Sequence, residues 1–284
     1  MKSLGNTSYN LFMEFFTYLE TLLKIQIPQE KCAAFKDFYK EYQEGSLEFN
    51  HKHNAEVFTE ASYTGFCTLV SSTVVLKRKK LQSKRGKIVF LHAIAHIEYS
   101  AIDLAMDAAY RFKNLPKAYY DDFLSIANDE VKHFEMLEGL LKELDSFYGD
   151  LPVHDGLFEA SVKTLDLTER MAVVPRYLEA NGLDVTPMMI EKFLQLEDDI
   201  YASKIIKALE IILDEECDHV HKGDAWFKYS CDLEGLAYDS YFEIIEKHYP
   251  GSFPRKKDLN IRARQEAGFS CSELKRMNTM VECK

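Results

Sequence analysis

Two copies of a Glu-x-x-His motif constrain the fold of this chain most strongly: Glu130 with His133, and Glu216 with His219. Both fall in stretches with helical periodicity, and residues three apart on a helix project from one face, one turn apart. The positions a turn away from each Glu are largely apolar, and burying a bare carboxylate among them is very costly. The repeated motif therefore predicts a buried di-metal site, in which each carboxylate bridges two ions and each imidazole binds one.

A di-metal bundle of this kind needs one further Glu from each of two other helices. Glu98 is one candidate, because the positions around it on its helical face are apolar. On the next helix, Glu179 and Glu169 compete. Glu98 precedes Glu130 by 32 residues and Glu179 precedes Glu216 by 37, whereas Glu169 would precede it by 47. The similar spacing favours Glu179. The predicted ligands are Glu98, Glu130, His133, Glu179, Glu216 and His219.

Helical periodicity dominates the rest of the chain, and only 7 Pro and 12 Gly are present to make turns. The pattern predicts helices over residues 9–24, 29–43, 87–112, 117–146, 155–181, 187–221 and 232–248. Within the fifth helix, Pro175 predicts a kink. Asn181-Gly182 is typical of a helix C-terminus, and Thr186-Pro187 is typical of an N-cap followed by the first helical residue.

The four long predicted helices, joined by short loops, indicate an antiparallel bundle. The predicted fold is all-α: a ferritin-like di-metal four-helix bundle over residues 86–250. An extension with extra N-terminal helices precedes it over residues 1–85, and a C-terminal tail follows over residues 251–284. Within the extension, the Val-rich stretch 69–76 fits a short strand or a helical segment equally well.

The formal net charge is −11, which disfavours unaided binding to phosphate backbones and anionic membranes. Residues 77–87 depart from this balance, with seven positive charges in eleven residues. A solvated loop is the simpler interpretation of this run, and contact with an anionic partner is the functional one.

Neither a targeting signature nor a stretch approaching the roughly 18 apolar residues of a transmembrane helix is found. The six cysteines are scattered without a C-x-x-C pair, which favours reduced thiols and a cytoplasmic location. Among other polar residues, His92 and His96 are expected to pack, or to support the ligands from outside, rather than bind metal. Four side chains are candidates to orient the ligands: Asp129, Asp218, Asp199 and Arg176.

Three segments of the chain resemble a family known chiefly as a ferritin-like domain of unknown function: Leu91-His-Ala-Ile-Ala-His-Ile-Glu98, residues 212–224 and residues 260–269. The resemblance spans about residues 85–270 and implies a ferritin-like fold with a metal site, but no substrate. Many members have a second His next to the first Glu, where this chain has Ile97. The Tyr-Leu-Glu179-Ala stretch is also similar to the third-helix ligand region of the di-iron tRNA hydroxylases, which supports Glu179.

Four carboxylates and two imidazoles form a hard, oxygen-rich ligand set suited to iron or manganese. We expect two iron ions, with manganese or a mixed Mn/Fe pair as alternatives. The expected function is an oxygen-activating oxidoreductase of the monooxygenase or hydroxylase type, with dioxygen, a small-molecule substrate and an electron donor as partners. An iron-binding or peroxide-detoxifying protein and a non-catalytic metal-stabilised binding module are the alternatives, and the chain could form a homodimer.

A tRNA substrate follows only from the resemblance to the hydroxylases, and the net charge of −11 argues against it. Its footprint would be residues 77–87 together with the basic residues of the tail. Those residues are Arg255, Lys256, Lys257, Arg262 and Arg264.

Overall fold

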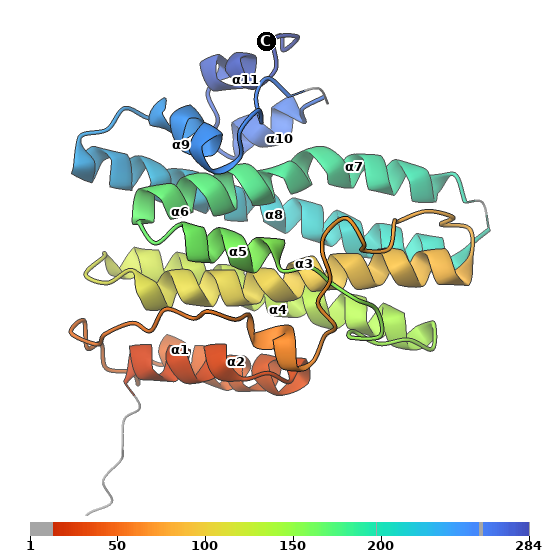
Figure 1. Cartoon of the computed structure of the whole chain (residues 1–284), viewed down its shortest axis with the longest axis horizontal. Coiled ribbons are helices and arrows are strands. Elements are labelled where there is room, and N and C mark those ends of the chain that lie inside the picture. Colours follow the sequence, from red (N-terminus) through yellow and green to blue (C-terminus); the bar gives the residue numbers. More distant parts are fainter. Residues whose placement is uncertain (1–13, 197, 256–257, 284) are drawn as a thin grey trace, which may run out of the picture.

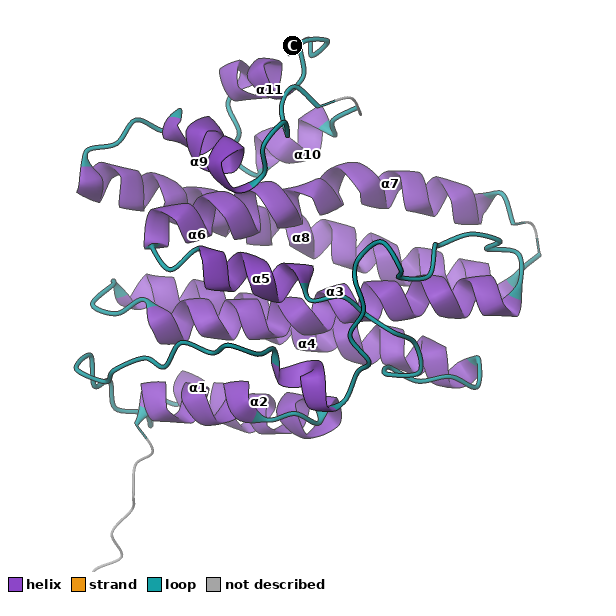
Figure 2. Cartoon of the chain, in the orientation of Figure 1, coloured by secondary structure: helices purple, strands orange, loops and turns teal. Residues whose placement is uncertain are grey.

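The computed structural model describes residues 14–196, 198–255 and 258–283, and it is all-helical. Within these ranges no β-strand occurs; there are only two isolated β-bridges, Glu14 with Glu48 and Leu69 with Val153. The stretch 69–76, which fitted a strand or a helix, forms loop and turns instead. Figure 2 shows the helices with the loops that connect them.

Four long helical stretches lie side by side through the molecule (Figure 1). They are α3 (Lys84–Arg111), α4 (Lys117–Glu143), the continuous run of α6 (Leu167–Val173), η2 (Val174–Glu179) and α7 (Ala180–Leu194), and α8 (Ile200–Glu234). Helix α3 packs along α4, α7 packs along α8, and α8 also contacts α4 and α6. The third stretch has the shorter α5 (Gly156–Lys163) before it, which packs on α3.

The N-terminal part packs against this core. Helix α1 (Phe15–Lys24) contacts α3, and α2 (Pro28–Gln43) contacts α4. A short turn of 3₁₀-helix, η1 (Ser62–Gly65), follows. Helix α1 begins at Phe15 because the Glu14 carboxylate accepts hydrogen bonds from the Phe16 and Thr17 N–H groups. The predicted helix at 9–24 is present from Phe15, and its first five residues lie outside the described ranges.

The predicted end of the fifth helix at Asn181-Gly182 is wrong. The chain continues in helical conformation from Leu167 to Leu194, and Pro175 lies in a π-helix, η2. The predicted start of the next helix at Thr186-Pro187 is also wrong, because Pro187 lies inside α7. Packing outweighs these local signals: Leu183 is fully buried, and Phe193 makes an edge-on contact with Phe90 of α3.

Helix α8 begins at Ile200, where the Asp199 carboxylate accepts hydrogen bonds from the Tyr201 and Ala202 N–H groups. It ends at Glu234, where Gly235 adopts the left-handed conformation with φ 69°. It therefore extends well past the predicted end at residue 221. The predicted short helix at 232–248 is present only as α9 (Ser240–His248).

The C-terminal part forms two short helices, α10 (Ile261–Glu266) and α11 (Cys271–Met277), above α7 and α8 (Figure 1). A disulfide joins Cys271 to Cys283, which departs from the expectation that all six thiols are reduced. The remaining cysteines, Cys32, Cys67, Cys217 and Cys231, are free. Buried apolar residues from α1 through α11 belong to one continuous core.

Among the described helices, α3 is long and apolar enough to cross a membrane by length and composition. Its most apolar 18-residue window is 83% buried within the fold, as is usual for the central helix of a core. This burial explains its apolar sequence.

Candidate metal centre

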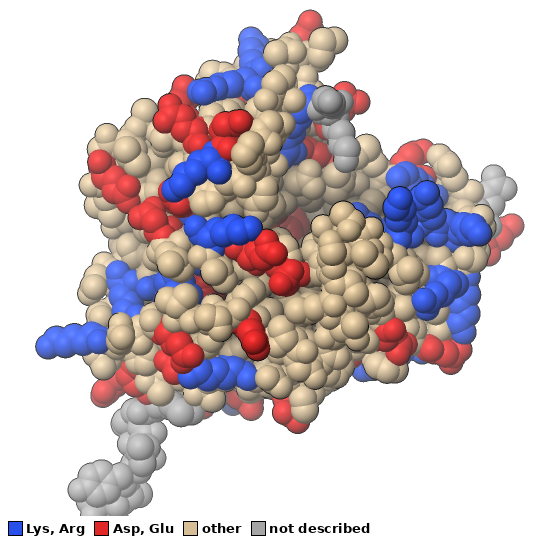
Figure 3. Space-filling view, viewed as in Figure 1, with Lys and Arg blue, Asp and Glu red and all other residues tan. Residues whose placement is uncertain are grey.

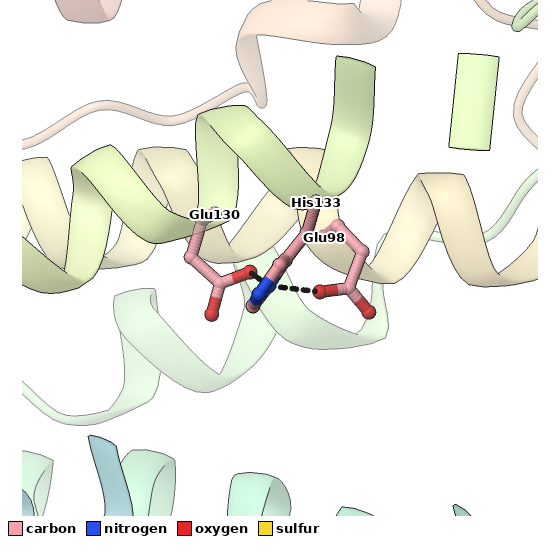
Figure 4. Close-up of side chains that lie close together, drawn as sticks. All are labelled: Glu98, Glu130 and His133. Atoms are coloured by element: carbon pink, nitrogen blue, oxygen red, sulfur yellow. Dashed lines mark hydrogen bonds and ion pairs between the residues drawn. The ribbon is translucent and has the colours of Figure 1, made fainter. Parts of the chain in front are cut away.

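The first cluster of potential metal ligands joins α3 to α4. Glu98 of α3 and Glu130 of α4 point toward His133, one turn beyond Glu130 on the same helix (Figure 4). The His133 Nδ1 atom lies 3.2 Å from Glu98 Oε2 and 3.4 Å from Glu130 Oε2. All three side chains are buried, and one ligand atom from each lies within 4.8 Å of the others. This is a separation that one metal ion can span.

A second cluster shares Glu130 and adds Glu216 and His219 of α8. The His219 Nδ1 atom lies 3.2 Å from Glu130 Oε1. In the described part of the chain, three buried atoms here make no hydrogen bond of good geometry, although the first two lie within ion-pair distance of each other: Glu130 Oε1, His219 Nδ1 and Glu216 Oε2. Buried polar atoms almost always have hydrogen-bond partners. Two carboxylate oxygens and an imidazole nitrogen that face one another in this way therefore suit a bound cation. The two carboxylate oxygens of Glu130 thus face one cluster each.

The structure places Glu179 at the end of η2, outside both clusters. Its carboxyl is close enough to Glu130 and His219 for their charges to shift its pKa. The competing Glu169 points elsewhere: it pairs with Lys247 and lies 2.8 Å from His248 Nε2. Glu179 also lines a small cavity of about 10 Å³, room for about one water-sized molecule, whose other walls are largely apolar.

The pKa shifts of these groups show how much negative charge is concentrated here. Burial and the charge of Glu130 raise the pKa of Glu98 to about 8 and that of Glu179 to about 7, and they raise the pKa of Glu216 well above its usual range. Burial would also raise the pKa of Glu130, but its contacts with His133 and His219 outweigh burial and lower it. One carboxylate is therefore ionised among groups that favour protonation.

The histidines respond in the opposite direction. Burial alone would lower the pKa of His133, but the hydrogen-bonded carboxylates of Glu130 and Glu98 raise it to about 11. The pKa of His219 is raised well above its usual range, because Asp129 and Glu130 outweigh the effect of burial. Without metal, protons thus balance the charge of the carboxylates. Metal ions would displace these protons on binding, since carboxylate and imidazole ligands bind in deprotonated form.

Each histidine is held from behind by a carboxylate on the other helix. The His133 Nε2 atom of α4 lies 2.7 Å from Glu215 Oε2 of α8. The His219 Nε2 atom of α8 lies 3.4 Å from Asp129 Oδ2 of α4. Lys132 pairs with both Glu215 and Asp129. Both rings therefore direct Nδ1 toward the centre, which is how outer carboxylates fix the orientation of metal-binding histidines.

Asp129 was among the predicted orienting residues, whereas sequence reasoning missed Glu215. A signal for it exists, because an acidic residue precedes the Glu in both motifs: Asp129 before Glu130, and Glu215 before Glu216. This acidic position lies one turn before the His of its own motif. On each helix it faces the neighbouring helix.

The other predicted orienting residues lie elsewhere. Asp218 pairs with Lys222 at the surface, and Asp199 caps α8 and pairs with Lys87. Arg176 is fully buried and pairs with Asp224 and Glu273. These contacts of Arg176 connect η2, α8 and α11 and do not reach His133 or His219.

His92 and His96 pack, as the sequence indicated. The Nε2 atom of His92 accepts a hydrogen bond from the Gly149 N–H at 2.9 Å, and a longer one from the Leu151 N–H. The ring nitrogens of His96 contact the Tyr148 hydroxyl and the His154 carbonyl, each at 2.8 Å. Both rings therefore anchor the segment after α4 to α3.

The chemistry of the donors fits a pair of hard metal ions. Glu98, Glu130, His133, Glu216 and His219 supply carboxylate and imidazole atoms in two clusters that share Glu130, with Glu179 beside them. Carboxylate-rich sites with few imidazoles suit iron and manganese. The described residues place no thiolate in either cluster.

The predicted basic footprint is only partly at the surface. Arg264 is fully buried and Arg255 largely buried, and both pair with Asp184 of α7. Arg262 is exposed and pairs with Glu266, while Lys256 and Lys257 lie outside the described residues. Of the three described arginines in this footprint, Arg255 and Arg264 therefore contribute to internal ion pairs.

The fold and these clusters define an all-helical protein with buried Glu and His groups that could bind metal. The chain belongs to the family described as "Protein of unknown function (DUF455)", whose model matches residues 24–275. It is similar to an uncharacterised protein of Haemophilus influenzae, with 37% identity over 276 residues that cover 93% of both chains. No solved structure matches the chain.

Proposed function

We propose that this protein is a ferritin-like, carboxylate-bridged di-iron protein that uses dioxygen to oxidise a small molecule. The observation that carries the proposal is that Glu130 belongs to two ligand clusters at once, one with Glu98 and His133 and one with Glu216 and His219. A carboxylate shared by two clusters is the feature expected of a bridging ligand. A manganese or mixed pair would fit the same donors.

When bound, two reduced irons supply electrons that dioxygen can accept. Glu98, Glu130, His133, Glu216 and His219 would hold the pair, and Glu179 would complete the set from η2. Glu215 and Asp129 would keep both imidazoles oriented and hold the proton on each Nε2. The largely apolar walls of the small cavity beside Glu179 would keep bulk water from the centre. Turnover as a monooxygenase needs an external two-electron donor as co-reactant.

Metal analysis of the purified protein tests the proposal directly. We expect about two irons per chain after anaerobic loading with Fe²⁺, as the paired clusters imply, and an oxygen-dependent change in the near-ultraviolet absorbance. Glu130→Ala and Glu216→Ala should each lose the bound pair. Full iron occupancy in both variants would refute the assignment of the ligands. A loaded protein that is inert to oxygen would refute the enzymatic part and favour a non-catalytic binding module.

A further inference from the structure

A cleft opens between α3 and the third helical stretch, and all the Lys, Arg, Asp and Glu residues known to line it in the described part of the chain are cations. Two adjoining hollows form it, with volumes of about 310 Å³ and about 560 Å³. They share lining residues from three parts of the chain: Val75, Leu76, Arg78, His154 and Asn181. Volumes of this size are typical of sites for small molecules. Figure 3 shows a hollow on this face, with Lys and Arg side chains gathered over the start of α3 and the end of α7.

The charge of the cleft is opposite to that of the molecule. Lys77, Arg78, Lys79 and Lys192 line the outer hollow, while no Asp or Glu among the described residues lines either hollow. In the part of the chain that the structure describes, none of these four cations has a carboxylate within ion-pair distance. The Arg78 guanidinium donates a long hydrogen bond to the Met189 sulfur at 3.9 Å. In a chain with a formal net charge of −11, four unpaired cations at one cleft focus the potential on an anion.

The inner part of the cleft is mainly apolar. Val89 and Ala93 of α3, Leu157 of α5 and Leu178 of η2 line it, with His96 among them. Outside it, Met188 and Met189 of α7 continue the apolar wall. Among the described residues, Phe90 is the one Phe, Tyr or Trp side chain that lines the cleft, and this lack of stacking surface argues against a single-stranded nucleic acid. The cleft therefore fits a ligand with an apolar body and one anionic end.

The position of the cleft connects it to the candidate metal centre. Ile97 lines its inner hollow and directly precedes Glu98, while Leu178 lines it and directly precedes Glu179. The wall of the cleft and two of the candidate ligands thus lie on the same helical turns. An apolar body seated in the inner hollow would extend toward this part of the molecule, with its anionic end among the outer cations.

We propose that this cleft binds an amphipathic anion, a small molecule with an apolar body and a terminal phosphate or carboxylate, as the substrate of the metal centre. The assignment as substrate rests on the proposed function, whereas binding itself requires only the cleft. Arg78 and Lys192 hold the anionic group, and the apolar walls hold the body.

Calorimetric titration of the full chain with octyl phosphate, octanoate and 1-octanol tests the proposal. We expect one of the two anions to bind at least about tenfold more tightly than 1-octanol, since a charge-assisted contact is lost in the alcohol. The better anion identifies the head group. Equal affinities for all three compounds, or no binding of either anion at millimolar concentration, would overturn the proposal. If total tRNA displaced the bound anion at lower concentrations than octyl phosphate does, the proposal would be overturned in favour of a nucleic-acid surface.

Variants separate the two parts of the cleft. Arg78→Gln and Lys192→Gln should each weaken anion binding about tenfold, whereas Lys204→Gln, which removes an exposed lysine of α8 paired with Glu143, should not. Ala93→Trp should fill the inner hollow and abolish binding of the alkyl chain, with the circular dichroism spectrum checking the helices. Unchanged binding in Arg78→Gln and Lys192→Gln would refute the assignment.

Metal content measured on the same variants distinguishes the two proposals. Arg78→Gln should retain the metal of the unmodified protein while it loses the anion. If the unmodified protein binds metal but neither anion, the cleft assignment fails and the proposed function stands. If it binds the anion but no metal, the cleft remains a binding site and its role as the substrate site of a metal centre fails.

Discussion

Glu215 of α8 lies 2.7 Å from the Nε2 atom of His133 on α4, behind the imidazole that faces Glu98 and Glu130. Asp129 of α4 has the same relation to His219 of α8, at 3.4 Å. The two helices therefore orient each other's histidines. This reciprocal arrangement explains why both motifs have an acidic residue before the Glu, and it leads to the first prediction.

Glu215→Ala should weaken metal binding by about 10–100-fold, the usual cost of losing an outer carboxylate. The variant leaves the candidate ligands in place, but the His133 ring loses the partner that fixes its orientation. Titration of the metal-free protein with Fe²⁺ under anaerobic conditions measures the effect. Glu210→Ala is the matched control, because Glu210 is exposed on the same helix and should leave the affinity unchanged. Equal affinities in both variants would show that Glu215 has no orienting role.

Metal removal should destabilise the protein, because the candidate ligand carboxylates have only protons to balance them when no ion is bound. A ligand at 100 times its Kd stabilises the native state by about 2.7 kcal/mol. Anaerobic addition of Fe²⁺ to the metal-free protein should therefore raise Tm by several degrees. Glu130→Gln preserves the side-chain volume and should abolish this increase. A similar increase in the variant would mean that iron binds outside the two clusters.

Gly223→Ala should disturb η2 and with it Glu179. A Cβ atom at residue 223 would lie 2.1 Å from the Pro175 Cβ, so α8 or η2 must shift to accommodate it. Overpacking of this kind typically costs about 1–3 kcal/mol, measurable by urea unfolding, and metal affinity should fall with it. Gly182→Ala is the control: no heavy atom lies within 4 Å of the added Cβ, so this helical position should be stabilised by up to about 1 kcal/mol. If Gly223→Ala were as stable as the unmodified protein, the close packing of α8 on η2 would be refuted.

His92 should make the protein less stable in mild acid. Burial lowers its pKa from 6.5 to about 4, and its Nε2 atom accepts backbone hydrogen bonds only when the ring is neutral. The neutral form contributes its full stability above pH 6.5, and this contribution is lost as pH falls toward 4. Between pH 7 and pH 5 the loss should be about 2 kcal/mol. Asp150 and Arg85 act on the ring with opposite effects on its pKa and do not reverse this shift.

Urea unfolding of the metal-free protein at pH 7 and pH 5 tests this dependence. His92→Gln should be less sensitive to the change of pH, although less stable at pH 7. His221→Gln, at an exposed position of α8, should retain the sensitivity of the unmodified protein. An identical pH dependence in His92→Gln and the unmodified protein would contradict a neutral, buried His92.

Much of the structure follows from periodicity in the sequence. The long helices α3 and α4 lie close to their predicted ranges, since apolar stripes of that length have few other ways to be buried. Glu98, Glu130 and His133 meet, as do Glu130, Glu216 and His219, because a Glu and a His three residues apart share a helical face. Whether these residues bind metal, with Glu179 as a further ligand, stays a prediction.

The helical run from Leu167 to Leu194 and the following helix α8 show where local sequence signals fail to predict helix boundaries. Asn181-Gly182 and Thr186-Pro187 are typical of helix ends, yet α7 runs through both. A helix boundary is decided by the packing of the whole segment, which outweighs the propensity of one or two residues. The π-helix at Val174–Glu179 has no sequence pattern of its own beyond Pro175, and the absence of a Cβ at Gly223 of α8 lets it pack closely there.

By itself, the sequence determined that the chain is helical and which faces carry the buried carboxylates and imidazoles, because those properties depend on residues a few positions apart. Only the tertiary structure decided which helix supplies the carboxylate behind each histidine, and that the cations around Arg78 line a cleft beside the candidate centre. These relationships join residues far apart in the chain. They depend on how the helices pack together, which no local pattern encodes.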